Sequence, residues 1–277
     1  MTRAALNTVV IYGGFDDLWP VNFRFFEEAA KLGDVLALLW SDDVIKKATG
    51  KTTKFPQEER LYLLESIRYI HKVIVINDVQ PDALPTLPEF KPAIWVVDEQ
   101  NDNAPKKAFS KANNIKYHVL KNDTLNRFPD YVPDLRKTVS SRKKVIVTGC
   151  YDWLHSGHVR FFEEVSEFGN LYVSIGSDKT IRELKGKGHP MFPQNQRRFV
   201  VQSIKYVKQA FVATGSGQLD AEQQIHQIRP DIYAVNEDGD RPEKREFCKA
   251  NGIEYVVLKR LPKPGLPQRQ STTLRGF

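Results

Sequence analysis

The sequence of 277 residues contains only two cysteines, Cys150 and Cys248, and six histidines. Two cysteines cannot build a disulfide framework, and their spacing is not that of a metal site, so a reducing compartment is expected. No apolar run approaches the roughly 20 residues that span a membrane. The start, MTRAALNTVVIYGG, reaches a strand-like run within a few residues and leaves no space for a signal peptide. We therefore expect a cytoplasmic protein with no membrane segment.

The net charge of +7 raises the question of nucleic-acid binding. Much of the excess lies in mixed stretches such as KKAFSKANN and EKREFCKAN, where cations share a solvated helical face with other polar residues. No base-stacking motif or groove-reading module accompanies the charge. A pocket that handles phosphate also needs several unpaired cations, so we expect no nucleic-acid partner.

The sequence contains an internal repeat. The segment FDDLWPVNFRFFEE (15–28) reappears as YDWLHSGHVRFFEE (151–164), and KPAIWVVDEQND (91–102) as RPDIYAVNEDGD (229–240). The correspondence covers most of both halves in the same order, which indicates a duplicated domain. The prolines, serines and clustered charges of 122–144 show no sustained period and favour a boundary there. We expect domains at 1–130 and 144–277, joined by a linker at 131–143.

Each half alternates short apolar runs with amphipathic segments. In the second half VIVTG, LYVSIGS, AFVAT, IYAVN and YVVLK are typical of buried strands. Between them, 159–169, 194–207, 221–230 and 241–251 have helical patterns, and Gly169 is a stop signal for the first of these. Alternating strands and helices predict an α/β protein with two tandem Rossmann-like domains, each a parallel sheet with helices on both faces.

A chemically distinctive segment follows the first strand of the second half. Gly149, Cys150 and Tyr151 lead into a histidine pair, His155 and His158, at the expected start of a helix. The end of a parallel strand that feeds a helix N-terminus is where such sheets bind anionic ligands. The intervening Gly157 lets the backbone approach closely. The two imidazoles then lie beside the anion as donors to a phosphoryl oxygen.

Zinc ligation by His155 and His158 is an alternative, but the sequence offers no third ligand nearby. A second alternative is that both residues are ordinary surface histidines. Their position directly after a strand favours the anion site.

On these residues, TGCYDWLHSGHVRFFEE resembles the signature of the HxGH nucleotidylyltransferases, which have a cytidylyltransferase-like fold. It is similar to glycerol-3-phosphate, phosphocholine and phosphoethanolamine cytidylyltransferases and equally to heptose-1-phosphate adenylyltransferases. The resemblance spans residues 144–273 and, in weaker form, the first half. It implies that His155 and His158 contact the triphosphate and stabilise the transition state.

The resemblance assigns further residues to the site. LKGKGHP matches the lysine segment of the family and gives Lys185 a catalytic phosphate contact, with a solvated turn lysine as the alternative. VNEDGD stands at the base-binding loop, and STTLR at a phosphate-holding helix start, with an ordinary helix cap as the alternative. The residues so implied as nucleotide ligands are Asn236, Asp238, Asp240, Ser271, Thr272 and Thr273.

The sequence does not assign a single role to two more residues, Arg197 and Asp152. Arg197, in PQNQRR, is either a phosphate ligand or a solvated helix residue, whereas Asp152 is expected to orient or cap its loop. Nucleotidyl transfer needs positioning and charge neutralisation and no covalent enzyme intermediate. Magnesium is the expected cofactor, with no dedicated protein metal site.

The first half lacks these features. Trp19 and Asn22 stand opposite the two histidines, Thr49 stands opposite Lys185, and no Ser-Thr-Thr segment precedes the linker. The packing residues around them persist, so we expect a pseudo-catalytic domain that makes the chain a pseudo-dimer, with homodimerisation of the whole chain left open.

We predict a nucleotidylyltransferase that activates a small phosphorylated or phosphonylated metabolite and releases pyrophosphate. The IKYV segment (204–207) resembles the cytidylyl branch and favours CTP, although Lys205 and Lys208 depart from its pattern. SDKTIRELKGKGHPMFPQNQRR resembles the ATP-dependent branch at least as well. A nucleotide-binding regulator that does not turn over is the alternative from another class.

Overall fold

The computed structural model describes residues 8–78, 80–131 and 141–274. The chain divides into two compact units, residues 1–128 and 129–277. Most of the expected linker, 131–143, lies outside the described residues, so the domain limits expected from the sequence stay a prediction. Within the described ranges, every helix falls short of the length and apolar character that a membrane span requires.

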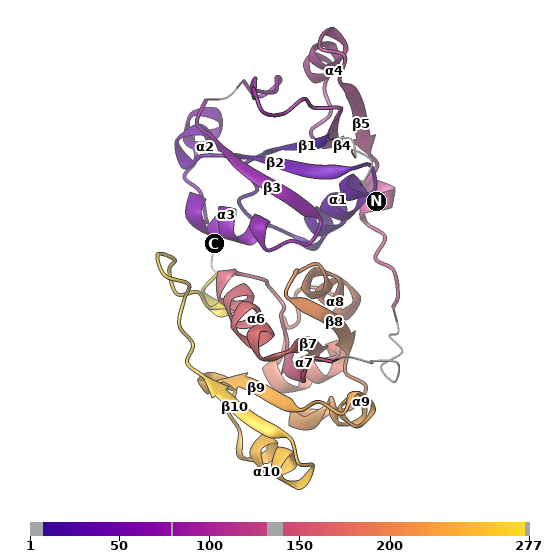
Figure 1. The fold of residues 1–277 in the computed structure, drawn as a ribbon, viewed down its shortest axis with the longest axis vertical. Helices are drawn as coiled ribbons and strands as arrows, with labels where there is room; N and C mark the ends of the chain where they lie inside the picture. Colours follow the sequence, from indigo (N-terminus) through magenta and orange to yellow (C-terminus); the bar gives the residue numbers. More distant parts are fainter. Residues whose placement is uncertain (1–7, 79, 132–140, 275–277) are drawn as a thin grey trace. The chain divides into compact units, whose positions relative to one another are not determined.

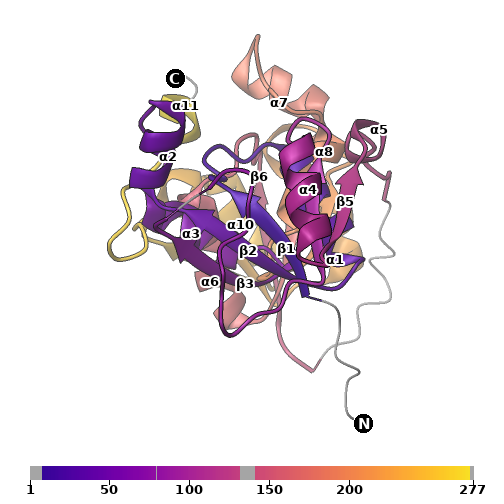
Figure 2. The ribbon, with the colours of Figure 1, turned by 90° about the horizontal axis from the view of Figure 1, so that it is seen from above.

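The first unit is a five-stranded parallel sheet in the order β3-β2-β1-β4-β5. Figures 1 and 2 show α3 beside β3 and α4 beside β5, at the two edges of this sheet. Its elements are β1 (Thr8–Gly13), α1 (Pro20–Ala30), β2 (Asp34–Trp40), α2 (Asp42–Thr49), α3 (Gln57–Glu65), β3 (Ile70–Ile76), β4 (Ile94–Asp98), α4 (Ala104–Ala112), β5 (Lys116–Leu120) and α5 (Asn122–Leu125).

The second unit repeats this topology, with the strand order β8-β7-β6-β9-β10. Its elements are β6 (Lys144–Gly149), α6 (Ser156–Phe168), β7 (Asn170–Ile175), α7 (Asp178–Lys185), α8 (Gln194–Gln202), β8 (Val207–Val212), η2 (Gly217–Leu219), α9 (Glu222–Ile228), β9 (Ile232–Asn236), η3 (Glu237–Gly239), α10 (Pro242–Ala250), β10 (Glu254–Leu258) and α11 (Ser271–Leu274). The predicted pair of tandem Rossmann-like domains is confirmed.

The repetition extends to irregular details of the backbone. The pairing of β2 with β3 shifts register between Val35 and Leu36, and that of β7 with β8 shifts at the equivalent Leu171 and Tyr172. After the first strand of each unit, Phe15 and Tyr151 both adopt positive φ angles, 48° and 49°. A positive φ costs energy for a bulky residue, so its presence in both copies shows that the same turn shape is retained.

The central strands form the core of each unit. In β1 and β6 three consecutive residues, Val9–Ile11 and Val145–Val147, are completely buried. Strands buried on both faces consist of continuous apolar runs, as expected for parallel sheets covered by helices. In both sheets the chain reverses its winding beside the first strand, between β1 and β4 and between β6 and β9. The carboxyl edge at this point is where such folds bind ligands.

One helix is shorter than its sequence pattern predicts. The pattern favours a helix over 194–207, but α8 ends at Gln202 and Val207 already begins β8. The Ser203 hydroxyl donates to the Phe199 carbonyl at 2.8 Å, which satisfies a carbonyl in the last turn of the helix. The segment 204–207 therefore belongs to the turn and the strand.

Candidate active site

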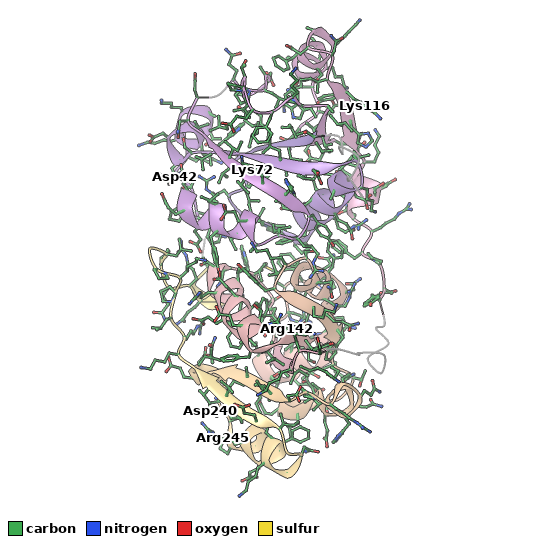
Figure 3. All side chains as sticks on the ribbon, in the orientation of Figure 1. Asp42, Lys72, Lys116, Arg142, Asp240 and Arg245 are labelled. Carbon is green, nitrogen blue, oxygen red and sulfur yellow. The ribbon has the colours of Figure 1, made fainter. Side chains whose placement is uncertain are left out.

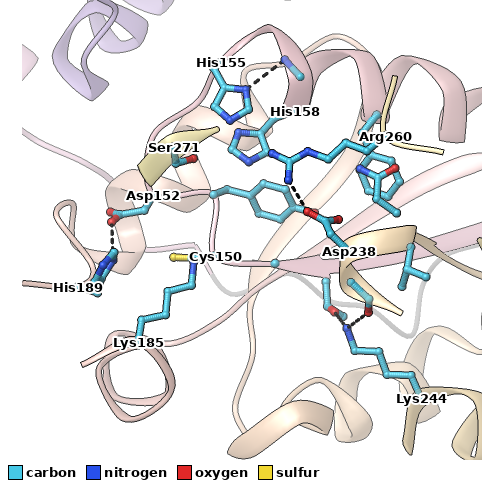
Figure 4. A pocket seen from close by; sticks show the side chains of 18 residues that line it. Cys150, Asp152, His155, His158, Lys185, His189, Asp238, Lys244, Arg260 and Ser271 are labelled. Carbon is cyan, nitrogen blue, oxygen red and sulfur yellow. Dashed lines mark hydrogen bonds and ion pairs between the residues drawn. The ribbon is translucent and has the colours of Figure 1, made fainter. Parts of the chain in front are cut away.

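A cavity of about 200 Å³ lies at the carboxyl edge of the second sheet. Figure 4 shows side chains from the β6 loop, α6, α7, the loop after β9, α10 and the segment after β10 around it. Gly149 at the end of β6 has no room for a side chain, because a Cβ there would lie 2.7 Å from the Tyr151 ring. The predicted residues that line the cavity are Gly149, Cys150, Tyr151, His155, Gly157, His158, Lys185, Asn236, Asp238 and Ser271.

The two histidines are held as a stacked pair. His155 is the N-cap of α6, and its Nδ1 accepts a hydrogen bond from the Gly157 backbone N–H at 3.1 Å. The His155 and His158 rings lie 3.9 Å apart, with 22° between their planes. Because Nδ1 accepts, the proton of a neutral His155 resides on Nε2. That Nε2 is buried without a hydrogen-bond partner among the described residues, so it is available as a donor to a ligand.

Both histidines are uncharged in the free site. Burial lowers the pKa of His155 well below 6.5, and the nearby His158, Arg260 and Arg269 lower it further. Burial, with Arg260 and Lys185, lowers the pKa of His158 from 6.5 to about 3. An anion that enters the cavity therefore meets neutral N–H donors surrounded by fixed cations. Because that anion would offset the cations, it would also favour protonation of the imidazoles.

Lys185, for which a phosphate contact was predicted, is the last residue of α7, is exposed and lines the cavity. Two further cations were missed by the sequence analysis, Arg260 after β10 and Lys244 in α10. The Arg260 guanidinium forms an ion pair with Asp238 and donates to the Arg269 carbonyl at 3.0 Å. Arg260 stands where the first half has Asn122, so comparison of the two halves could have identified it.

Lys244 is buried against the cavity wall. Its Nζ lies 3.4 Å from the Thr148 hydroxyl and 3.5 Å from the Gly239 carbonyl. Burial, followed by the charge of Arg241, lowers the pKa of Lys244. His189, which also lines the cavity, lies with its Nδ1 3.8 Å from Asp152.

Asp240, which was predicted to bind nucleotide, is not among the residues that line the cavity. It lies directly after η3, two residues before α10 begins, and its side chain faces Arg245 (Figure 3). Its carboxylate accepts from the Arg245 guanidinium at 2.5 and 2.8 Å and from the Tyr255 hydroxyl at 3.1 Å. The Arg245 contact lowers the pKa of Asp240. These contacts draw the side chain toward Arg245 and Tyr255, outside the cavity.

Arg197, which the sequence left open between phosphate binding and a solvated helix face, is buried in contacts within the second unit. Arg197 is 1% exposed and lies outside the cavity lining. Its guanidinium donates to the carbonyls of Phe192, Cys150 and Gly176 and pairs with Asp178 at 2.8 Å. In the first unit Arg60 makes the equivalent contacts, including a 2.6 Å ion pair with Asp42. Since the arginine is kept in both units, it holds the loops of the fold together.

Asp152 also makes hydrogen bonds that hold loops of the fold together. Its carboxylate accepts backbone hydrogen bonds from Met191 and Phe192 at 2.7 to 3.0 Å. In the first unit Asp16 accepts from the backbone of Lys54 and Phe55 at 2.8 Å. Both carboxylates tie the loop after the first strand to the loop before the third helix of the unit, as the sequence led us to expect for Asp152.

The Ser-Thr-Thr segment forms α11, and Ser271 lines the cavity with its Oγ 3.4 Å from the Trp153 carbonyl. Thr272 and Thr273 lie in the same helix, but their side chains are outside the described residues. The described residues include no group of three or more His, Cys, Asp or Glu side chains that could hold a metal ion.

The equivalent positions of the first unit are built differently. Trp19 is the N-cap of α1 and is 46% exposed, and its backbone N–H donates to the Asn22 side chain at 2.7 Å. The Thr49 hydroxyl donates to the Ile45 carbonyl, and Thr49 does not line the cavity of this unit.

Comparisons with known proteins agree with this architecture. The family model described as cytidylyltransferase-like matches twice, at residues 10–148 and 146–263. The chain is 36% identical over 120 residues to the FAD synthase of Ferroglobus placidus, which covers 42% of this chain and 75% of the relative.

It is 29% identical over 127 residues to the bifunctional protein HldE of Syntrophotalea carbinolica, which covers 45% of this chain and 25% of the relative. A solved lipopolysaccharide core biosynthesis protein from Thermoplasma volcanium aligns at 27% identity with a TM-score of 0.38, over 43% of this chain and 98% of that one. The chain thus belongs to the cytidylyltransferase-like family, which its two halves match in turn, and its function is of the nucleotidylyltransferase type.

Proposed function

We propose that the second unit carries out the transfer, and that the cavity beside His155 and His158 holds the triphosphate of the nucleotide. One observation carries this proposal: two neutral imidazoles, the buried His155 and the partly buried His158, converge on one cavity with three cations at the carboxyl edge of the sheet. The cations are Lys185, Lys244 and Arg260. Three cations around one cavity match a polyanion, and the unpartnered Nε2–H of His155 matches a phosphoryl oxygen.

In the proposed reaction, an oxygen of the phosphorylated acceptor attacks the α-phosphorus of the nucleotide. A new P–O bond forms, and the bond to the β-phosphate oxygen breaks with its electron pair, so pyrophosphate leaves. His155 and His158 donate hydrogen bonds to the crowded α-phosphoryl oxygens. Lys185 and Arg260 neutralise the charge that gathers on the departing pyrophosphate. Each such donor accounts for about 10² to 10³ in rate.

Magnesium fits this site only as a complex with the nucleotide. Mg²⁺ is commonly held by one or two carboxylates together with substrate phosphates. Asp238 is the carboxylate that lines the cavity near the proposed triphosphate and is not tied to the backbone as Asp152 is. When bound, the ion supplies Lewis-acid charge to the phosphates.

We propose ATP as the nucleotide and a small phosphorylated or phosphonylated metabolite as the acceptor. Relatives named FAD synthase, whose product contains an adenylyl group, support ATP. The segment that favoured CTP, 204–207, does not line the cavity: Ile204 is buried, and the Tyr206 hydroxyl donates to Glu163 at 3.1 Å. CTP is the second candidate, supported by the resemblance of that segment alone.

The test is pyrophosphate release by the purified chain with magnesium, ATP or CTP, and a panel of phosphomonoesters and phosphonates. We expect release with ATP and one class of acceptor. Faster release with CTP would reverse the nucleotide assignment and leave the site intact. Tight nucleotide binding without release across the panel would favour a regulator that does not turn over.

We also propose that the first unit is pseudo-catalytic. Asn22→Ala is expected to leave the rate of pyrophosphate release within about threefold of the parent chain, whereas His158→Ala is expected to lower it at least a hundredfold. Loss of activity in a well-folded Asn22→Ala protein would contradict this division of roles.

A further inference from the structure

The first unit retains a cavity at the place where the second unit has its proposed active site. This cavity, about 630 Å³, lies at the carboxyl edge of the first sheet, beside the loop after β1 and the loop after β4. Its volume is within the range that small-molecule sites commonly have. The position is again the point where the winding of the sheet reverses.

The charge of this cavity has the opposite sign to that of the second unit. Five carboxylates line it, with a single lysine, Lys106, whose Nζ donates to the Asn101 carbonyl at 2.7 Å. The carboxylates are those of Asp16, Asp17, Asp82, Asp98 and Asp102. At the corresponding place the second unit gathers Lys185, Lys244 and Arg260. Ion pairs with Lys54 and Lys107 offset the charges of Asp17 and Asp102. The other three carboxylates still outnumber Lys106, so a triphosphate is repelled from the first cavity, whereas a cation is attracted.

Several of these carboxylate oxygens are free to accept from a ligand. Among the described residues, Asp98 accepts two hydrogen bonds, from the Asn101 backbone N–H and side-chain amide, and both go to Oδ1 at 2.8 Å. Asp17 binds Lys54 and Trp19 through Oδ2, and its Oδ1 is buried without a partner among the described residues.

Aromatic rings line the same cavity. Tyr12, Trp40 and Trp95 stand where the second unit has Thr148, Gly176 and Tyr233. The Tyr12 ring lies edge-on to Trp40 at 5.4 Å and to Trp95 at 6.4 Å. Rings combined with carboxylates are the environment in which organic ammonium ions are bound, through cation–π contacts and charge.

Trp95 provides a separate indication of a ligand. It is 1% exposed, and its indole Nε1–H has no acceptor within the described parts of the chain. A buried donor without an acceptor costs free energy that an oxygen atom of a bound molecule would recover. The missing acceptor points to a ligand that carries a hydroxyl or ether oxygen as well as its cationic group.

We propose that the cavity of the first unit binds a small organic ammonium ion that also bears an oxygen acceptor. This site is separate from the transfer site, and the proposal does not depend on the activity of the second unit. It gives the pseudo-catalytic unit a ligand of its own, of opposite charge to a nucleotide.

The test titrates the full-length protein with choline, ethanolamine and spermidine, followed by tryptophan fluorescence and by calorimetry. The neutral isostere of choline, 3,3-dimethylbutan-1-ol, serves as the uncharged control ligand. Phosphocholine tests whether an added anionic group weakens binding. We expect at least one cation to bind at millimolar concentration or below, and choline to bind at least tenfold more tightly than its isostere. ATP should not displace the cation.

Asp98→Asn keeps the Oδ1 acceptor for Asn101 and removes one charge, so it should weaken cation binding about tenfold. Asp43→Asn, an exposed change in α2 outside the cavity, is the matched control and should bind as the parent does. Absence of binding by all three cations would overturn the proposal. Equal binding of choline and its isostere, or unchanged binding by Asp98→Asn, would overturn it equally.

Discussion

Acidification should destabilise the second unit through the histidine pair, His155 and His158. The pKa of His158 is about 3 in the folded protein and 6.5 in its ordinary state. As the pH falls below 6.5, His158 becomes protonated in the unfolded chain but stays neutral in the folded protein. The free energy of unfolding therefore falls with the pH until about pH 3. His155, whose pKa is also lowered, acts in the same direction.

The size of the effect follows from the linkage relation. Each pH unit over which only the unfolded state is protonated changes the free energy of unfolding by about 1.4 kcal/mol. Between pH 7.5 and pH 5 the contribution of His158 is therefore a loss of about 2 kcal/mol. This is a large part of the roughly 5–15 kcal/mol that stabilises a typical domain.

The assay compares urea unfolding of the parent chain and His158→Gln at the two pH values. Fluorine NMR of fluorotryptophan-labelled protein isolates the second unit, because Trp153 is its only tryptophan. We expect the variant to lose about 2 kcal/mol less than the parent on acidification. His226→Gln removes an exposed histidine of the same unit and should behave as the parent does. Equal losses in His158→Gln and the parent would refute the neutral state of this imidazole in the folded protein.

Three further predictions test the roles of individual cations. Lys185→Met should lower kcat/KM for the nucleotide about a hundredfold in steady-state assays, whereas Lys187→Met, outside the cavity, should not. Arg260→Asn introduces the residue that the first half has at this position and should lower kcat by a similar factor. Because a neighbouring cation is lost, it should also raise the pKa of His158 in an NMR titration. Arg245→Asn is the control. Arg197→Met should leave Asp178 without its ion-pair partner and three carbonyls without a donor, and so lower the free energy of unfolding of the second unit by about 3–5 kcal/mol in urea. Arg182→Met, at an exposed position, is the control and should be close to neutral. Equal stabilities of the two variants would contradict the structural role of Arg197.

The fold was predictable because the same alternation of apolar runs and helical patterns occurs twice. Lys185 came only from the resemblance of LKGKGHP to a segment of the family. The place of the histidine pair at one edge of a parallel sheet was predictable, because a strand followed by a helix start puts it there. Arg197 was not, because its burial depends on carbonyls of Cys150 and Gly176 that are remote in the sequence. In isolation, PQNQRR has the composition of a solvated helix start.

Comparison of the two halves separates the two kinds of arginine. Arg197 has a counterpart in Arg60, in a unit that lacks the histidines, and this shared position indicates a structural role. Arg260 has no such counterpart, since Asn122 stands opposite, and this difference indicates a role in the site. The position of Asp240 outside the cavity could not be predicted, because Arg245 and Tyr255 reach it only in the folded unit.

The most direct test of the account measures how many ATP molecules bind to each chain, by equilibrium dialysis with magnesium. We predict one ATP per chain, with binding lost in the double variant Lys185→Met/Arg260→Asn and retained in Lys106→Met, which removes the single lysine lining the first cavity. Two ATP molecules per chain, or binding that survives the double variant and disappears in Lys106→Met, would contradict it.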